Sequence, residues 1–482
     1  MLRGASIATL VALVTIAGAS WQADAAPATP KRPNIVHIVA DDLGWKDVGF
    51  NGATDIKTPN IDKLAETGAK FTQFYVQPMC TPTRAALMTG RYPYRYGLQT
   101  MVIPSVSDYG LDTTEWLMPQ ALKEAGYKTA IIGKWHLGHA DKKYWPKQRG
   151  FDYQYGAMIG ELDYFTHDEH GVLDWFRDNE PVKEEGYTTT LLGKDAEKYI
   201  DAHDPSTPFY LYLTFNAPHT PYQAPQEYID RFKNIEDPTR RTYAGMVSCL
   251  DDEIGRVIAA LDKKGIRDNT LIIFHSDNGG TRNAMFAGVM ADMSKVTLPC
   301  DNGPYREGKG TLFEGATRVC ALANWPGKIK AGSTVDGLIH AVDLYPTLAD
   351  LAGASTEKCK PLDGVNVWSV ISEGNASPRN ELVYNIEPFR AAIRQGDWKL
   401  IWRTLIPTTV DLYNLADDPS ETKNLASEHP EKVTEIQKRL NELGKDSAKP
   451  LFLVDQMKVI NKNMQGEPLM PGEDQFYLQE TP

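Results

Sequence analysis

The sequence feature best suited to covalent chemistry is a cysteine that opens a helical segment. Cys80-Thr81-Pro82-Thr83-Arg84 runs into Ala85-Ala86-Leu87-Met88, a stretch that favours helix. Pro82 fits the first helical turn, so Cys80 should lie at the helix N-terminus, where the backbone favours anions and charged nucleophiles. Arg84, four residues on, returns to the same helix face. The pattern predicts an activated thiolate, and a buried structural cysteine is the alternative.

Acidic and amide side chains form a second candidate group. Asp41 and Asp42 stand together early in the chain, and Asp277 and Asn278 stand together in its middle. They offer oxygen ligands only, which suits Ca²⁺, or Mg²⁺ as the alternative, rather than zinc. Three crowded carboxylates without a cation would repel one another and raise each other's pKa. These residues predict a hard-cation site that leaves positive character for an anionic substrate.

Basic and imidazole side chains complete the set. Lys134 and His136 lie in Gly133-Lys134-Trp135-His136, His219 follows Asn216-Ala217-Pro218, and Lys309 lies between two glycines. Each has a plainer interpretation: a lone histidine is commonly structural, and the charged stretch around Lys309 could be a solvated turn. The aspartates likewise could be helix caps.

Weaker candidates lie around position 165. Asp163, Tyr164 and His167 could line a sugar-binding rim or cap a loop, and Glu161 and His170 are further candidates in the same stretch.

The elements that must position these residues are short apolar runs rich in β-branched residues, typical of buried parallel strands. They alternate with helical patterns, which predicts an α/β fold with a large, mostly parallel sheet flanked by helices. Most of the polar candidates follow the predicted strands, at the sheet edge where ligands bind in such folds. The predicted strands are Asn34 to Ala40, Lys128 to Ile132, Phe209 to Phe215 and Leu271 to His275; the predicted helices are Ile61 to Thr67, Trp116 to Ala125, Tyr243 to Lys263 and Val342 to Ala352.

The pattern changes near Arg379. Short strands joined by turns and then a helix predict a smaller α+β subdomain with an antiparallel sheet. The tail beyond Lys449 has no clear period. The expected organisation is a signal peptide (1–25), a catalytic domain (26–378) and a C-terminal subdomain (379–482). The expected strands are Glu381 to Ile386, Arg390 to Arg394, Trp398 to Trp402 and Val410 to Tyr413, with a helix from Pro430 to Leu443.

The first residues have the pattern of an export signal. A basic start, Met1-Leu2-Arg3, precedes an apolar run from Ile7 to Ala19 and the small-x-small site Ala23-Asp24-Ala25. Cleavage after Ala25 would give a periplasmic or secreted protein, and an uncleaved anchor is the alternative. The net charge of −12 over 482 residues argues against nucleic acid or anionic membranes as partners.

Five cysteines are present and none forms a CxxC pair, which argues against a zinc or redox motif. If Cys80 is set apart, Cys249, Cys300, Cys320 and Cys359 allow three disulfide pairings, and free buried thiols are the alternative.

Several of these motifs together resemble the type I, formylglycine-dependent sulfatase family. Cys80 to Arg84, continued by Leu87-Met88-Thr89-Gly90-Arg91, resembles the first signature of that family, and Gly133 to Gly138 resembles the second. The resemblance covers nearly the whole mature chain and implies an alkaline-phosphatase-like fold. It also includes Asp41-Asp42-Leu43-Gly44, Asn216 to His219, Ser276 to Gly279, Gly308-Lys309-Gly310 and Asp411-Leu412-Tyr413-Asn414-Leu415. Within the family, Arg149-Gly150-Phe151-Asp152 and Asp163-Tyr164 are most similar to arylsulfatase B, the N-acetylgalactosamine-4-sulfatase type.

The resemblance changes the role expected of Cys80. It implies that a separate formylglycine-generating maturation enzyme oxidises Cys80, and that a hydroxyl of the hydrated aldehyde attacks sulfur. Residue 80 would bind calcium together with Asp41, Asp42, Asp277 and Asn278.

The resemblance also implies roles for the remaining residues. Arg84 would hold the formylglycine, and Lys134 and Lys309 would clamp the sulfate oxygens. His219 would protonate the departing oxygen, a role shared with Lys309. His136 would take the proton of the second hydroxyl, which expels sulfate and restores the aldehyde.

The expected function is hydrolysis of a sulfated carbohydrate or an aryl sulfate. Hydrolysis of a phosphomonoester, phosphodiester or phosphonate on the same scaffold is the alternative, but the sequence shows no extra set of Asp and His for a second metal. A non-catalytic protein that binds sulfated glycans would follow if Cys80 stayed a thiol.

Overall fold

The structure is a computed structural model that describes residue 1 and residues 32–169, 171–282, 298–404 and 407–469. The predicted signal peptide, apart from Met1, and the candidate residue His170 lie outside the described residues. Among the described residues, no helix is both long enough and apolar enough to span a membrane.

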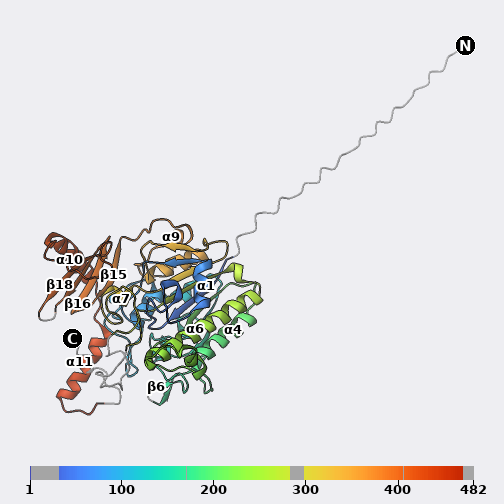
Figure 1. Cartoon of the computed structure of the whole chain (residues 1–482), viewed down its shortest axis with the longest axis horizontal. Coiled ribbons are helices and arrows are strands. Elements are labelled where there is room, and N and C mark those ends of the chain that lie inside the picture. The colour runs from blue at the N-terminus through green and yellow to red at the C-terminus, as the bar shows by residue number, and fades with distance from the viewer. Residues whose placement is uncertain (2–31, 170, 283–297, 405–406, 470–482) are drawn as a thin grey trace. The chain divides into compact units, whose positions relative to one another are not determined.

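A large mixed sheet, ten-stranded in the described part of the chain, forms the centre of the fold (Figure 1). Its strands β11, β1, β10, β4 and β5 run parallel at the centre, and antiparallel pairings flank them on both sides. This confirms the predicted mostly parallel sheet. In spatial order the strands are β13 (Ser333–Val335), β2 (Ala69–Phe71), β12 (Ala321–Asn324), β11 (Thr270–Ser276), β1 (Asn34–Ala40), β10 (Phe209–Thr214), β4 (Lys128–Gly133), β5 (Tyr153–Gly156), β8 (Phe176–Arg177) and β9 (Glu180–Pro181).

The register of the central strands brings their carboxyl ends to one edge. Val39 of β1 lies opposite Thr214 of β10 and His275 of β11, and Thr214 lies opposite Gly133 of β4. All four predicted strands are present with ends that differ by at most one residue from those expected. The residues that follow these strands are therefore neighbours in space.

Helices cover both faces of the sheet. The described residues form α1 (Pro59–Thr67), α2 (Cys80–Thr89), α3 (Met118–Glu124), α4 (Thr188–Ala202), α5 (Gln226–Ile229), α6 (Pro238–Lys263), α7 (Glu314–Thr317), α8 (Leu344–Ala352), α9 (Trp368–Glu373), α10 (Pro430–Gly444) and α11 (Leu451–Met464).

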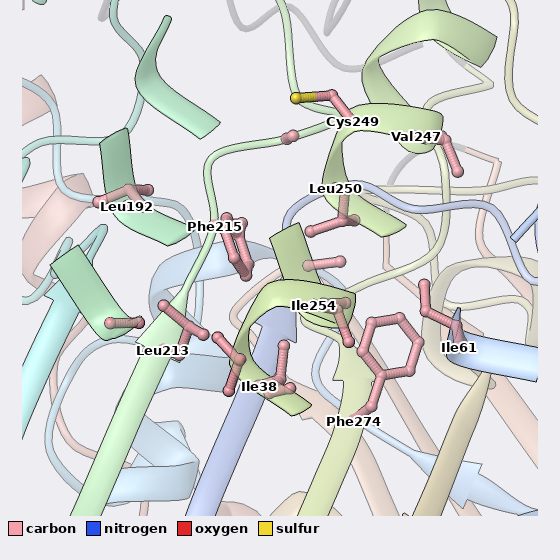
Figure 2. Packing of buried hydrophobic residues seen from close by; sticks show 14 of the residues in the cluster. Ile38, Ile61, Leu192, Leu213, Phe215, Val247, Cys249, Leu250, Ile254 and Phe274 are labelled. Carbon is pink, nitrogen blue, oxygen red and sulfur yellow. The ribbon is translucent and has the colours of Figure 1, made fainter. Parts of the chain in front are cut away.

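Alternate residues of β1 face the two layers, as the period of a strand requires. Ile38 packs with Leu250 and Ile254 of α6 on one face, where α1 and α4 also lie (Figure 2). Val39 faces the opposite layer, which is built from α2, α3, α8 and α9. The strands are buried on both sides, which explains their continuous apolar runs.

A smaller antiparallel sheet follows in the chain. Its strands are β15 (Glu381–Ile386), β16 (Arg390–Gln395), β17 (Trp398–Arg403) and β18 (Thr409–Asn414), and α10 packs on it. The predicted antiparallel sheet and helix are confirmed. Two further two-stranded sheets pair β3 (Phe74–Tyr75) with β14 (Ile339–His340), and β6 (Asp168–Glu169) with β7 (Val172–Leu173).

Two sequence expectations differ from the structure. The tail beyond Lys449 has no clear period, yet it forms α11, because Phe452 and Val459 bury against Met101 and Val106. All five cysteines lie within the described residues and are free there, which agrees with the free-thiol alternative and with none of the three disulfide pairings.

Candidate active site at the carboxyl edge of the sheet

The predicted strand-end residues meet at one edge of the sheet. Backbone hydrogen bonds join them: the Asp41 amide donates to Ala217 O over 3.1 Å, and the Asp277 amide donates to Ala40 O over 3.0 Å. The Lys134 amide donates to Thr214 O over 2.9 Å. The structure therefore brings together the segments after β1, β4, β10 and β11, as predicted.

Two residues of this edge have a backbone conformation that residues other than glycine rarely adopt. Asp42 has φ 62° and His136 has φ 56°, both in the left-handed region. Such conformations cost of order 1–3 kcal/mol and cluster at functional sites, where surrounding contacts hold them.

Cys80 lies where its motif predicts, as the first residue of α2. Ligand atoms of Asp41, Asp42, Cys80 and His219 all lie within 4.8 Å of one another, and all four residues are buried. This group differs from the expected ligand set, because it includes His219. The expected ligand Asp277 is paired with Arg84, whose Nε and Nη2 donate to Asp277 Oδ2 over 3.1 and 2.8 Å.

The donors around this group fit a hard cation. Asn278 donates from Nδ2 to Asp42 Oδ1 over 2.8 Å. The Oδ1 atom of Asn278 is buried and has no hydrogen-bond partner among the described residues. A buried acceptor without a donor costs about 1–3 kcal/mol, and a cation would satisfy it. Together with the carboxylates of Asp41 and Asp42, this oxygen gives the donor set that Ca²⁺ or Mg²⁺ prefers.

Three cationic side chains compensate the carboxylates. Lys134 Nζ donates to Asp41 Oδ2, Lys309 Nζ donates to Asp42 Oδ2 over 2.8 Å, and Arg84 Nη2 lies 3.6 Å from Asp41 Oδ2. Burial alone would raise the pKa of Asp42, but the charge and hydrogen bond of Lys309 hold it well below its usual range. The predicted sulfate-clamping lysines thus flank the predicted metal ligands.

The thiol of Cys80 is not activated. Burial raises its pKa well above the ordinary value, and the attraction of Lys134 and Lys309 only partly offsets this. Sγ instead donates a weak hydrogen bond to Asp41 Oδ1 over 3.5 Å. The thiolate interpretation drawn from the helix N-terminus is wrong, because burial raises the pKa of the thiol more than Lys134 and Lys309 lower it.

His219 has a defined tautomer. Its Nδ1 contacts the carbonyl of Thr220 at 2.7 Å and must donate, so Nε2 is the acceptor for Lys309 Nζ at 3.0 Å. Burial first, and then the charge of Lys309, lowers the pKa of His219 to about 3. The proton of this pair therefore resides on Lys309, and His219 is neutral.

His136 offers a free lone pair. Its Nε2 contacts Ile103 O at 3.2 Å and donates there, while Nδ1 is buried with no partner among the described residues. Burial first, and then Lys134 and Arg84, hold its pKa well below the ordinary value. Gly160 packs on the ring, since a Cβ at that position would lie 2.4 Å from Cε1 of His136.

The backbone carbonyl of Lys134 holds two neighbouring side chains of the site. It accepts hydrogen bonds from Arg84 Nη1 over 2.9 Å and from Thr214 Oγ1 over 2.7 Å. Arg84 and Lys134 are both fully buried, so their positions are fixed by these contacts.

The side chains of Asp163, Tyr164 and His167 mainly hold their own loop and its neighbours in place. Tyr164 is buried, and its hydroxyl donates to Asn216 O and His219 O over 2.7 and 2.9 Å. His167 is buried, with its ring 4.8 Å from that of Trp175. Asp163 accepts backbone N–H groups of the two residues that follow Tyr164. These contacts favour the loop-capping interpretation.

Glu161 is a further candidate in the same stretch. Its side chain is half-buried, and burial raises its pKa to about 7, with Lys309 opposing that rise.

Sequence reasoning named Asn216 as part of a strand-end motif without giving it a role, and it missed Thr281. Both polar atoms of the Asn216 side chain are buried with no partner among the described residues, as expected of a group that awaits a ligand. Its position directly after a predicted strand was the available signal. Thr281 donates from Oγ1 to Asp42 Oδ2 over 3.1 Å, and nothing in its sequence context indicates this.

Comparison with protein families gives two matches. A family model described as "Sulfatase" matches residues 33–354. A second, described as "N-sulphoglucosamine sulphohydrolase, C-terminal", matches residues 307–447. Together they span the site and the antiparallel sheet.

Individual proteins are similar over most of the chain. Arylsulfatase J of Mus musculus is 34% identical over 477 residues, with 88% of this chain and 77% of the relative covered. N-acetylgalactosamine-6-sulfatase of Homo sapiens is 32% identical, with 76% and 71% covered. A solved structure of Ps i-CgsB in complex with k-i-k-neocarrahexaose superposes with a TM-score of 0.81 at 35% identity, over 93% of this chain and 100% of that one.

Proposed function

The chain belongs to the sulfatase family of sulfuric ester hydrolases, and from this we propose that it hydrolyses sulfate esters of carbohydrates at the site around residue 80. The proposal includes maturation of Cys80 to Cα-formylglycine and binding of Ca²⁺ by Asp41, Asp42, Asp277, Asn278 and residue 80. The supporting observation is the convergence of Cys80 with Asp41, Asp42 and His219 within 4.8 Å.

When present, the formylglycine would supply the nucleophilic hydroxyl, and the calcium ion would supply Lewis acidity toward that hydroxyl and the sulfate. The chain's own residues do the remaining work. Lys134 and Lys309 carry the positive charge beside residue 80 that an anionic sulfate needs, and both are buried, which strengthens their attraction. Arg84 fixes Asp277 and the Lys134 backbone on the metal side.

Two imidazoles handle protons in the proposed reaction. His219 Nε2 accepts from Lys309, so this pair holds a proton that can pass to the departing oxygen of the substrate. His136 has an unprotonated Nδ1 without a hydrogen-bond partner in the described part of the chain and a fixed Nε2–H, which suits the base that releases sulfate. The two histidines therefore divide the acid and base roles.

A carbohydrate is the proposed carrier of the sulfate. The similar Ps i-CgsB was solved with a hexaose, and the similar N-acetylgalactosamine-6-sulfatase is named for an amino sugar. The half-buried carboxylate of Glu161 would accept hydrogen bonds from sugar hydroxyls beside the sulfate.

Release of inorganic sulfate from a panel of esters tests this function. The panel comprises defined sulfated oligosaccharides, an aryl sulfate, the matching aryl phosphate and desulfated controls. We expect sulfate release from at least one oligosaccharide and from the aryl sulfate. Turnover of the aryl phosphate in preference to the aryl sulfate would favour the phosphate-ester alternative, and no turnover with tight glycan binding would favour the non-catalytic one.

We also propose that the chain is exported after cleavage following Ala25, because its first residues have the basic, apolar and small-residue pattern of a signal peptide. N-terminal sequencing of the protein recovered outside the cytoplasm should begin at Ala26. Recovery of an intact Met1 in the cytoplasmic fraction would contradict this.

A further inference from the structure

The segment that carries Lys309 lies between the active site and the small antiparallel sheet. We call residues 305–316 the Lys309 loop. On the active-site side, the Lys309 amide donates to Gly280 O over 3.3 Å and the Gly310 amide donates to Pro78 O over 2.9 Å. Pro78 precedes Cys80 by two residues, so the loop's position sets where the Lys309 ammonium lies relative to residue 80.

The other side of the loop is held by the antiparallel sheet and the segment after it. Arg390 of β16 donates from Nη1 to Gly310 O over 2.6 Å. Arg306 donates from Nη1 to the Tyr413 hydroxyl of β18 and to the Glu421 carbonyl, each over 3.2 Å. The Glu314 amide donates to Glu421 Oε2 over 2.6 Å. Glu421 thus meets both ends of the loop.

The two ends of the loop are also tied to each other. The Gly315 amide donates to Arg306 O over 2.8 Å. A Cβ on Gly315 would lie 2.4 Å from that oxygen and 2.3 Å from Glu307 O, so the backbones touch directly. Because the loop closes on itself here, a shift at Glu314 must move the residues just before Lys309.

Glu421 is itself held rigidly. Lys399 of β17 lies 2.8 Å from Glu421 Oε1 and 3.0 Å from Glu314 Oε1. Tyr75 and Tyr384 donate their hydroxyls to Glu314 over 2.6 and 2.7 Å. Both carboxylates and the ammonium are fully buried, so the loss of any one of them would leave a buried charge less well compensated.

We infer that Glu421 is a positioning residue for Lys309: its carboxylate holds the Glu314 amide and thereby fixes the Lys309 ammonium opposite Asp42 and residue 80. The inference rests on the proposed function for the consequence in turnover. It also assigns a role to the Asp411-Leu412-Tyr413-Asn414-Leu415 motif, whose tyrosine accepts from the same loop.

The test compares three replacements of Glu421. Glu421→Ala removes the acceptor, and Glu421→Asp draws it back by one methylene while keeping the charge opposite Lys399. Both should lower kcat/KM for an aryl sulfate by about 10- to 100-fold, as a misplacement of about 1 Å does. Glu421→Gln keeps an acceptor for the Glu314 amide, although its amide nitrogen then faces Lys399, so kcat/KM should fall clearly less than in Glu421→Ala. If Glu421→Gln lowers kcat/KM as much as Glu421→Ala does, the acceptor at residue 421 does not position the loop.

A double-mutant cycle separates positioning from general damage. In a Lys309→Ala background, Glu421→Ala or Glu421→Asp should lower kcat/KM by less than about threefold, because the group being positioned is gone. An equal factor in both backgrounds would overturn the inference. The matched control is Glu381→Ala on the same sheet. The Glu381 carboxylate pairs with Arg439 at 2.8 Å and accepts from Gln395 over 3.0 Å, so its removal should leave kcat/KM unchanged.

A crystal structure of the same variants tests the inference without turnover. In Glu421→Asp, the distance from Lys309 Nζ to Asp42 Oδ2 should increase by more than about 1 Å, while Glu421→Gln should keep the 2.8 Å contact. An unmoved loop in Glu421→Asp would refute the inference. Failure of the wild-type protein to release sulfate would instead refute the proposed function and leave this structural comparison to decide the inference.

Discussion

Replacing His219 by alanine tests the proposed proton donor through the leaving group of the substrate. His219 Nε2 lies 3.0 Å from Lys309 Nζ, the ammonium that holds the proton, and 3.6 Å from Asp42 Oδ2. A positioned general acid contributes about 10²- to 10⁴-fold to the rate. This help matters only where the departing oxygen is a poor leaving group.

The loss should therefore depend on the substrate. We expect His219→Ala to lower kcat by at least about 100-fold for a carbohydrate or alkyl sulfate, equivalent to about 2.7 kcal/mol of transition-state stabilisation. For 4-nitrophenyl sulfate, whose phenolate leaves with little protonation, the loss should stay below about tenfold. The assay is sulfate release at saturating substrate for both esters.

Two controls accompany this comparison. His203→Ala replaces a histidine whose Nε2 contacts the nearby Thr207 carbonyl at 2.7 Å, and it should leave both rates unchanged. The calcium concentration for half-maximal activity should also stay unchanged in His219→Ala. Equal losses on both esters, or a weakened calcium dependence, would show that His219 binds sulfate or metal rather than donating a proton.

Three further predictions concern the nucleophile, the metal and stability. Cys80→Ala should abolish sulfate release while the apparent Tm stays close to that of wild type; release at the wild-type rate would remove residue 80 from the mechanism. A strong chelator should lower activity and Ca²⁺ should restore it, whereas indifference to chelation would count against the Asp and Asn site. Asp174 accepts the Met158 and Ile159 amides over 2.9 Å, and burial raises its pKa from 3.8 to about 7. Because the folded state binds this proton more tightly than the unfolded state, the free energy of unfolding should fall as pH rises from about 4 to about 7. Asp174→Asn should remove that decrease, by up to about 4 kcal/mol at pH 8 in denaturant titrations; an unchanged pH dependence would contradict it.

Local sequence pattern was enough to predict the strands and the residues that follow them. The apolar run at Asn34–Ala40 is directly followed by Asp41, so the same pattern predicted both the end of the strand and the candidate ligand. The same logic placed Lys134 and Asp277. Parallel strands bring such positions together whatever the rest of the chain does.

Features that depend on distant contacts could not be predicted in this way. Glu421 accepts from the Glu314 amide across 107 positions of sequence, and no local pattern reports that pairing. The thiolate interpretation of Cys80 failed for a related reason, because the helix N-terminus is visible in the sequence but complete burial is not. Helix α11 was missed since tertiary packing, and not periodicity, stabilises it.

The central claim is that residue 80 of the active enzyme is no longer a cysteine. Its most direct test is the mass of the tryptic peptide 71–84 from protein that releases sulfate, with the peptide containing Cys249 as an internal control. The account predicts that the residue 80 peptide has exchanged its thiol for an aldehyde, while Cys249 keeps its sulfur. An unmodified Cys80 throughout fully active protein would contradict the account.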